Sequence, residues 1–230
     1  MKAPPRAAEV GLSALLWIVF IVGISVLTLT VPVFTSALSQ SLDVPDTAGL
    51  RVEDVVRLSG IVRAFVADLE YEPLPAVWRG QPAFDASAVS HLADVRSVLS
   101  GARVATGIAA LLLAIYLAAC IAHRRFDILS RGMLLGAGVT AGALLLAALA
   151  AVLDFERFFT LFHGLFFADG TWTFPADSLL IRLFPERFWA AAGASWAVLA
   201  LVLGAVLAAA AMVLRLRAVH KDASRMDANV

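Results

Sequence analysis

The sequence predicts an all-α membrane protein, a four-transmembrane-helix bundle with an extracytoplasmic helical cap. Of the 230 residues, 61% are apolar and only 16% are charged, and the mean hydropathy is +0.87, which is too apolar for an ordinary soluble domain. All 36 charged residues lie outside four uncharged runs that together hold 90 residues. A lone strand cannot satisfy its backbone groups in lipid, and the alternation typical of a membrane barrel is missing. The runs are therefore predicted to be helices.

Each uncharged run is long enough to cross a bilayer. A spanning helix needs about 20 apolar residues, and the runs of 22, 19, 22 and 27 residues are 10–31, 104–122, 132–153 and 188–214. The first run has an alternative interpretation as a cleaved signal peptide, because Lys2 and Arg6 precede it and small residues follow it. Its apolar stretch exceeds the usual length of about 7–15 residues, which favours a transmembrane helix.

The distribution of basic residues predicts the orientation of the chain. With four spans the termini share a side with the loop 123–131, and that side has nine Lys or Arg in 34 residues. The opposite side, an extracytoplasmic cap made of 32–103 and 154–187, has nine in 106 residues. Basic residues concentrate on the cytoplasmic side, so both termini of this single membrane domain, 1–230, are predicted to be cytoplasmic. The net charge of zero then divides into +5 inside and −5 outside.

The first outer segment is predicted to contain two helices. From Arg51 to Leu69 the apolar residues recur at three- and four-residue spacing, as in an amphipathic helix that lies on the membrane surface or caps the bundle. Pro73 and Pro75 follow the end of this helix. A second helix is expected to begin at Ser87 and to run without a break into the second span.

The spans themselves indicate packing rather than chemistry. Gly138 and Gly142 have the spacing of a helix-packing face. Cys120, the single cysteine of the chain, is expected to pack between helices. No ionisable residue lies within a span, which disfavours a transporter. The basic residues line the cytoplasmic membrane surface, so nucleic acid is not an expected partner.

The second outer segment is unusually aromatic. It holds nine of the 14 phenylalanines within the 36 positions from Asp154 to Trp189. An interfacial aromatic belt would explain this enrichment. The aromatic residues also surround a histidine and several carboxylates, a mixture that suits an amphipathic pocket at membrane depth. Composition alone leaves both interpretations open.

Two of the four histidines are candidate catalytic residues. His91 and His163 lie on the outer side, whereas His123 and His220 lie beside arginines on the cytoplasmic side. A lone histidine is more often a satisfied polar residue, but two on one face can act as an acid and base pair. Asp94 lies three residues after His91 and is placed to orient its ring.

Other chemistries lack their motifs. The chain has no H-E-x-x-H, no cysteine cluster and no G-x-S-x-G, so a zinc protease and an elbow-type serine hydrolase are unsupported. A metal held by His91, His163 and an acid is the weaker alternative, because the usual ligand spacing is missing. We therefore expect no metal.

The two histidine segments carry a family resemblance. The stretches concerned are His91-Leu-Ala-Asp94-Val-Arg96, Phe162-His163 through Trp172, Asp177-Ser-Leu-Leu-Ile and Leu183-Phe-Pro-Glu-Arg-Phe-Trp189. Together with the four-span layout and the large first outer segment, they resemble the lipoprotein intramolecular transacylase family of bacterial integral membrane proteins. That family commonly has a lysine where Arg96 stands.

The resemblance implies an acyl transfer in the bacterial cell membrane. The sn-2 acyl chain of a diacylglyceryl-modified lipoprotein would move to the α-amino group of its own N-terminal cysteine, giving the lyso-form lipoprotein. Membrane lipid and these lipoproteins are the expected partners. Both reacting groups belong to one substrate and an ester becomes an amide, so no cofactor is expected and orientation supplies much of the rate.

The resemblance also implies that His91 and His163 are catalytic. One would deprotonate the amine and the other would donate to the ester oxygens, in an order that the sequence does not assign. Trp172 is expected to support the site, and the expected substrate pocket consists of Tyr71, Phe162, Phe166 and Phe167. Asp177 and Arg182 are either supporting residues or a structural ion pair. The alternative function is a non-enzymatic accessory or lipid-binding protein that docks through its aromatic outer face.

Overall fold

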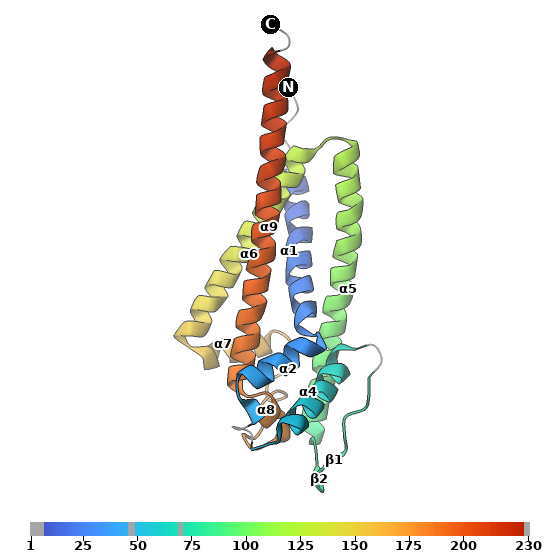
Figure 1. Ribbon diagram of the computed structural model, residues 1–230, viewed down its shortest axis with the longest axis vertical. Helices are drawn as coiled ribbons and strands as arrows, with labels where there is room; N and C mark the ends of the chain where they lie inside the picture. The colour runs from blue at the N-terminus through green and yellow to red at the C-terminus, as the bar shows by residue number, and fades with distance from the viewer. Residues whose placement is uncertain (1–6, 46–48, 69–70, 228–230) are drawn as a thin grey trace. The chain divides into compact units, whose positions relative to one another are not determined.

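The structure is a computed structural model that describes residues 7–45, 49–68 and 71–227, with side chains described up to Arg217. Most of these residues are helical (Figure 1). Four helices are long and apolar enough to cross a membrane: α1 (Ala7–Leu29), α5 (Ala86–Ala122), α6 (Phe126–Leu153) and α9 (Glu186–Asp227). The predicted all-α fold with four spans is therefore confirmed.

Helix α5 is much longer than the predicted span 104–122. It contains 37 residues, which at about 1.5 Å per residue extend over roughly 55 Å, whereas the hydrocarbon core is about 30 Å thick. The uncharged run 104–122 corresponds only to the part of α5 that is predicted to lie in hydrocarbon. The part from Ala86 to Arg103 extends the helix beyond that predicted span. The prediction of an unbroken helix from Ser87 into the second span is confirmed, with the start at Ala86.

One compact unit consists of Met1–Ser25, Val104–Leu146 and Ala197–Val230. It takes one portion from each of the four long helices. Its apolar core is built from Trp17, Leu113, Cys120, Leu129, Met133 and Ala211. Cys120 is 3% exposed and unpaired, in agreement with the expectation that it packs between helices.

Close helix packing in this unit involves other glycines than the sequence suggested. A Cβ atom added at Gly136 would lie 3.0 Å from the carbonyl oxygen of Ala14, and one added at Gly132 would overlap Ser13. Gly138 and Gly142 have no such neighbour within 4 Å, so the prediction that they form the packing face was wrong. Both pairs have the same spacing of four residues, but only the first pair lies on the side of α6 that meets α1.

A second compact unit consists of Val26–Arg103 and Ala147–Trp196. Besides parts of the long helices it contains α2 (Pro32–Ser41), α4 (Val52–Ala67), α7 (Phe155–Gly164) and α8 (Leu179–Leu183). It also contains an antiparallel hairpin of β1 (Val77–Trp78) and β2 (Gln81–Pro82). Residues of α4, α5, α8 and α9 share one apolar core, against which Leu38 of α2 and Trp78 of β1 pack, whereas α7 contributes no buried residue to it.

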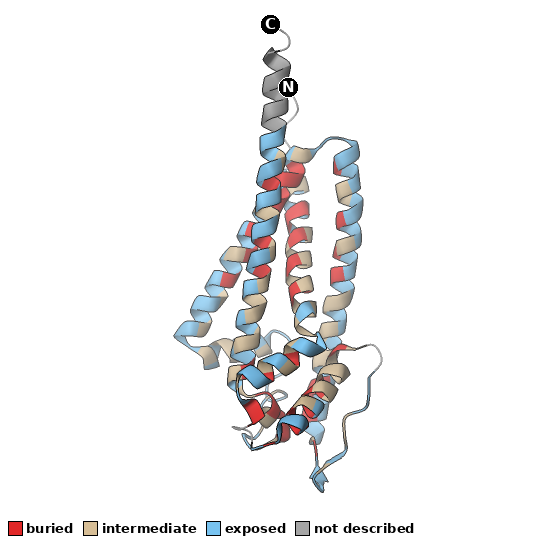
Figure 2. Cartoon of the chain, in the orientation of Figure 1, coloured by how far each residue is buried: buried red, intermediate tan, exposed pale blue. Residues whose placement is uncertain are grey.

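Helix α4 is the predicted amphipathic helix, and its apolar stripe is covered by protein (Figure 2). Val55, Leu58 and Val62 are 0–3% exposed. They belong to the same core as Leu180 and Leu183 of α8. The helix ends at Ala67 rather than at Leu69, which lies outside the described residues.

Two arginines of α5 form hydrogen bonds with backbone carbonyl groups at the C-terminal end of α4. Arg96 donates a hydrogen bond to the carbonyl oxygen of Phe65 at 2.6 Å, and Arg103 donates to that of Ala67. The last carbonyl groups of a helix have no partner within the helix and carry partial negative charge, so cations bind there favourably. These bonds fix the part of α5 that carries His91.

Candidate functional site

His91 lies in the second turn of α5, and Asp85 caps the N-terminus of this helix. The Asp85 carboxylate accepts hydrogen bonds from the backbone N–H of Ala88 and the hydroxyl of Ser87, both at 2.7 Å. These two hydrogen bonds hold the pKa of Asp85 below its usual range, and the bond from Ala88 has the larger effect. The rigid helix start places His91, only 9% exposed, beside the apolar core that includes Leu92.

His163 lies in the last turn of α7, which Asp154 caps by accepting a hydrogen bond from the backbone N–H of Arg157 at 2.9 Å. Phe155, Phe159 and His163 follow one another at four-residue spacing and form one row of rings. The rings of Phe159 and His163 have centroids 3.9 Å apart. The row is set by helical geometry alone.

A hydrogen bond orients the ring of His163. Its Nδ1 atom lies 2.9 Å from the carbonyl oxygen of Phe159. A carbonyl oxygen can only accept, so Nδ1 carries the proton in this arrangement. In the neutral ring, Nε2 therefore keeps its lone pair and can accept a proton.

A tight turn brings Trp172 back to this row. Gly170 adopts a positive φ of 80°, a conformation that residues with a side chain rarely take. The turn is closed by the Thr171 hydroxyl, which donates to the carbonyl oxygen of Ala168 at 2.8 Å. As a result the indole of Trp172 lies 4.8 Å from the His163 ring and 6.1 Å from the Phe159 ring, measured between centroids.

The structure brings the two outer histidines together. The rings of His91 and His163 are stacked, with centroids 6.3 Å apart and planes 29° apart. Phe167 touches both, at 4.9 Å from His91 and 5.8 Å from His163. Phe174 lies 5.5 Å from His91. The pair thus sits in a cluster of aromatic rings from α5, α7 and the segment that follows α7.

Burial lowers the pKa of both histidines. For His91, the pKa is lowered first by burial and then by the charge of His163, while the charge of Asp94 opposes the shift. For His163, burial lowers the pKa and the hydrogen bond to Phe159 opposes the shift. Both rings are therefore neutral near pH 7, and protonation of one disfavours protonation of the other. A neutral pair of this kind can accept one proton and donate a hydrogen bond at the same time.

Nδ1 of His91 and Nε1 of Trp172 are buried in the cluster and have no hydrogen-bond partner among the residues that the structure describes. Buried polar groups nearly always have a partner in native proteins. The indole nitrogen can only donate, so it offers a fixed N–H to any acceptor that enters.

Three other predicted site residues lie apart from the histidine pair. In the described part of the chain Asp94 is exposed and acts on His91 through its charge, without a hydrogen bond. Tyr71 packs its ring 3.7 Å from the guanidinium carbon of Arg96 and 5.0 Å from the ring of Phe65. Asp177 is exposed, at the start of the segment that leads into α8.

Among the described residues no salt bridge between Asp177 and Arg182 is observed, and the role of the two residues stays a prediction. Arg182 lies beside Gly49 instead, with its Nη2 atom 3.9 Å from where a Cβ atom would be. Also within the described residues, no three His, Cys, Asp or Glu side chains gather as a metal site would require.

The aromatic residues divide into two groups. Phe167 and Trp172 contact the histidines, together with Phe159 and Phe174, which the sequence had not singled out. Phe162, on α7, and Phe166, just after it, are 45% and 49% exposed, with ring centroids 5.3 Å apart, and the ring of Phe162 also lies 5.6 Å from that of His163. The four-residue spacing between Phe159 and His163 is a local pattern that could have identified Phe159 as a neighbour of this histidine. Phe174 has no such pattern and reaches His91 only through the tertiary fold.

The chain matches the family model for the lipoprotein intramolecular transacylase Lit over residues 10–189. A protein of Aquifex aeolicus (strain VF5), described as uncharacterized, is 27% identical over 148 residues, which cover 63% of this chain. The match spans 65% of the Aquifex protein's own length.

Solved structures show the same fold. The membrane integral lipoprotein intramolecular transacylase Lit from Bacillus cereus superposes with a TM-score of 0.76, at 17% identity over 92% of this chain and 98% of that chain. A variant of the same protein with a histidine changed to arginine gives a TM-score of 0.72, at 18% identity over 92% of this chain and 93% of that one. The likeness in fold extends over nearly the whole chain.

Proposed function

The chain belongs to the lipoprotein intramolecular transacylase family, a family of membrane acyltransferases, and from this premise we propose that it transfers an acyl chain within diacylglyceryl-modified lipoproteins. The sn-2 O-acyl chain moves to the α-amino group of the N-terminal cysteine of the same molecule, and the product is lyso-form lipoprotein. The observation that carries the proposal is the stacking of His91 on His163 in an aromatic cluster.

His163 is the proposed base. An α-amino group has a pKa of about 7.7–8.0, so much of it is protonated near neutral pH and cannot attack. Nε2 of His163 carries the free lone pair, and the lowered pKa keeps the ring neutral and ready to accept the amine proton. After the ammonium has released one proton to solvent, the neutral amine attacks the carbonyl carbon of the sn-2 ester on the same substrate, and Nε2 of His163 takes the second proton from the nitrogen as the C–N bond forms.

His91 and Trp172 are the proposed donors to the ester oxygens. Attack on the ester turns its carbonyl oxygen into an oxyanion, which needs fixed donors in a dry site. Nδ1 of His91 and Nε1 of Trp172 are buried and lack a partner, so hydrogen bonds to the substrate satisfy them. As the bond between the carbonyl carbon and the sn-2 oxygen breaks, the proton held by His163 passes to that oxygen. The amide and the free hydroxyl leave both histidines in their starting forms.

The aromatic rings around the histidines exclude water from the proposed reaction site. Phe159, Phe167 and Phe174 lie within 3.9–5.5 Å of one or other imidazole, centroid to centroid. Exclusion of water strengthens the hydrogen bonds to the oxyanion and prevents water from competing with the amine. The exposed Phe162 and Phe166 are suited to contact the acyl chains or the surrounding lipid.

The charge distribution supports the proposed location. Basic residues are about threefold denser on the side of the termini than on the side of the histidines. This asymmetry supports the proposal that the termini are cytoplasmic and that the histidine pair lies at the outer surface of the bacterial cell membrane. Lipoprotein N-termini anchored in the outer leaflet would meet the site there.

Mass spectrometry of lipoprotein N-termini tests the proposal. Cells that lack N-acylation of lipoproteins are supplied with the wild-type chain, and we expect the terminal amine to become acylated while one O-acyl chain is lost. A free amine with two O-acyl chains would overturn the proposal. A lipid-binding accessory protein, favoured by the exposed Phe162 and Phe166, would instead tolerate His91→Ala and His163→Ala.

A further inference from the structure

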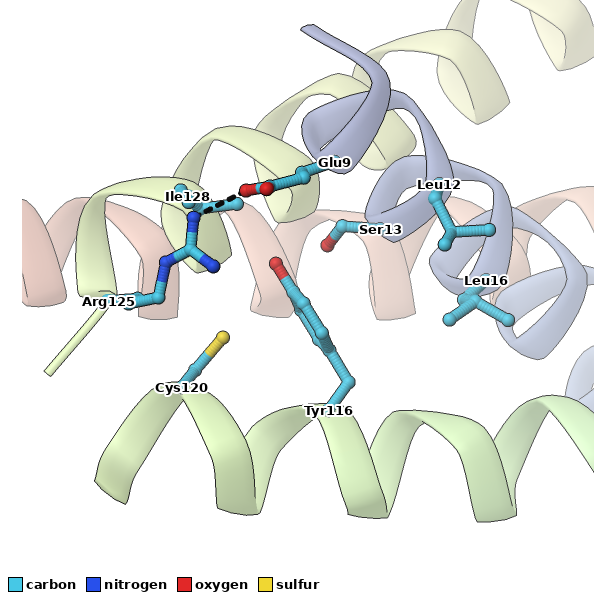
Figure 3. Close-up of a pocket in the computed structure, with 8 residues that line it drawn as sticks. All are labelled: Glu9, Leu12, Ser13, Leu16, Tyr116, Cys120, Arg125 and Ile128. Atoms are coloured by element: carbon cyan, nitrogen blue, oxygen red, sulfur yellow. Dashed lines mark hydrogen bonds and ion pairs between the residues drawn. The ribbon is translucent and has the colours of Figure 1, made fainter. Parts of the chain in front are cut away.

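A cavity of about 250 Å³ lies in the unit that contains Met1–Ser25 and Val104–Leu146, remote in sequence from the histidine pair. It is lined by Glu9, Leu12, Ser13, Leu16, Tyr116, Cys120, Arg125 and Ile128 (Figure 3). The first four residues form one face of α1, and Tyr116 and Cys120 lie one turn apart on α5. The lining is apolar along one side and polar along the other.

The polar side contains hydroxyl groups that are buried and poorly satisfied. Ser13 is 1% exposed, and among the described residues neither its Oγ atom nor the Oη atom of Tyr116 meets the full geometry of a hydrogen bond, although the two hydroxyls and the Cys120 thiol lie near enough to interact weakly. Figure 3 shows both hydroxyls and the thiol of Cys120 pointing into the same space. In the hydrocarbon region an unsatisfied polar group is unfavourable, so an occupant with hydrogen-bond acceptors suits this position.

The rim of the cavity carries one negative and one positive charge. Glu9 and Arg125 form a salt bridge through Oε2 and Nη2. Glu9 immediately precedes the uncharged run 10–31 and Arg125 follows the run 104–122, so the pair lies at the level where lipid headgroups begin. A guanidinium has five N–H donors and a carboxylate has about four acceptor sites, so both groups can bind further charges with the salt bridge intact.

We propose that this cavity binds an aminophospholipid from the leaflet at this end of the chain, which is the cytoplasmic leaflet in the proposed orientation. The lipid phosphate meets Arg125 and the primary ammonium meets Glu9, which completes a ring of alternating charges. The ester carbonyl oxygens below the headgroup accept hydrogen bonds from Ser13 and Tyr116. An acyl chain leaves along Leu12, which is 61% exposed.

The paired rim charges favour this lipid class over two others. An anionic glycerol headgroup offers its phosphate to Arg125 but brings no cation for Glu9. A choline headgroup carries a cation without N–H, so it cannot donate a hydrogen bond to the carboxylate. Water can satisfy the hydroxyls, but it does not distinguish between lipids.

The reactivity of Cys120 reports whether the cavity is occupied, because Cys120 is the single cysteine of the chain and lines the cavity. The full chain is reconstituted in phosphatidylcholine vesicles, alone or with phosphatidylethanolamine or phosphatidylglycerol. N-ethylmaleimide is added, and the intact mass follows alkylation. We expect phosphatidylethanolamine to slow alkylation by about tenfold, the effect of one charge-assisted hydrogen bond, and phosphatidylglycerol to leave the rate unchanged.

Variants of the lining residues distinguish a specific lipid site from a general effect of helix packing on the alkylation of Cys120. Glu9→Gln and the pair Ser13→Ala with Tyr116→Phe should abolish the protection by phosphatidylethanolamine. Ser25→Ala is the matched control, because Ser25 is a buried serine of the same helix whose hydroxyl already donates to the Ile21 carbonyl oxygen at 2.6 Å. This control should keep the protection.

Native mass spectrometry of the extracted protein provides a second measurement that does not depend on thiol reactivity. We expect one phosphatidylethanolamine molecule to remain bound to the wild-type chain and to be lost from the Glu9→Gln variant. Equal alkylation in all vesicles, equal protection by phosphatidylglycerol, or a wild-type chain that retains no phosphatidylethanolamine would overturn the proposal.

Discussion

Nδ1 of His163 lies 2.9 Å from the carbonyl oxygen of Phe159, one helical turn earlier on α7. This single contact fixes the proton on Nδ1 and leaves Nε2 as the basic nitrogen. His91 differs, because its Nδ1 is buried without a partner. The two imidazoles therefore have different proposed roles although they stack on each other.

His163→Asn tests the role of Nε2. The asparagine amide can still donate to the Phe159 carbonyl oxygen but has no basic atom, so we expect a folded protein whose transfer rate falls by about 10²–10⁴-fold. The rate is measured as loss of the free amine of a diacylglyceryl lipopeptide. His123→Asn, an exposed histidine in the loop after α5, is the matched control and should retain the wild-type rate. Wild-type activity in His163→Asn would exclude His163 as the base.

The pH profile of transfer reports the lowered pKa values. Because burial lowers the pKa of both histidines, we expect their acidic limb below pH 6.5, separate from the fall in rate that protonation of the substrate amine gives around its pKa of about 7.7–8.0. The same shifts favour the folded state above pH 6.5, and that contribution is lost as the pH falls through the lowered pKa values.

Asp94→Asn should move the acidic limb of this profile to lower pH. The charge of Asp94 raises the pKa of His91, so its removal lowers the pKa further. Asp177→Asn is the control, because Asp177 is exposed and is not among the groups that shift either histidine. A histidine-dependent limb at or above pH 6.5, distinct from the limb of the substrate amine, would contradict the account.

Trp172→Phe removes an N–H and keeps an aromatic ring. If this N–H stabilises the oxyanion, kcat falls by about 10²–10³-fold while KM changes little. Trp196→Phe removes another buried indole N–H without a partner, in α9, and should leave kcat unchanged. Equal rates for Trp172→Phe and the wild type would reduce Trp172 to a packing role.

Arg96→Ala should destabilise the helix that carries His91. Arg96 donates to the Phe65 carbonyl oxygen and stacks on Tyr71, and these interactions together contribute about 2–4 kcal/mol. Arg96→Lys keeps the charge and should recover part of the loss. Thermal unfolding in detergent measures the difference, with the exposed Arg57→Ala on α4 as the control. An unchanged melting temperature for Arg96→Ala would show that this contact is not needed.

Charge patterning was sufficient to predict the spans. Uncharged runs locate the helices because a charge in hydrocarbon is strongly unfavourable, whatever the tertiary contacts are. Helix faces are harder to predict. The pairs Gly132 with Gly136 and Gly138 with Gly142 have the same spacing, and only the position of α1 decides which pair is packed.

The site was predictable where it depends on topology or helix geometry. His91 and His163 were selected because both lie on the outer side, and Phe159 follows from its spacing to His163. Tyr71 is predicted to belong to the substrate pocket, and in the structure its ring stacks on Arg96, which lies 25 positions away. Long-range pairs of this kind depend on how α4 and α5 pack and leave no local pattern.

Transfer within one substrate molecule is the central claim, and an isotope crossover measurement tests it most directly. The purified chain is mixed with two diacylglyceryl lipopeptides that differ in peptide mass, one of which carries heavy acyl chains. We predict N-acylated products in which each peptide keeps its own acyl label, and no product with the His163→Asn variant. Exchange of labels between peptides, or a free amine after incubation with the wild-type chain, would contradict the account.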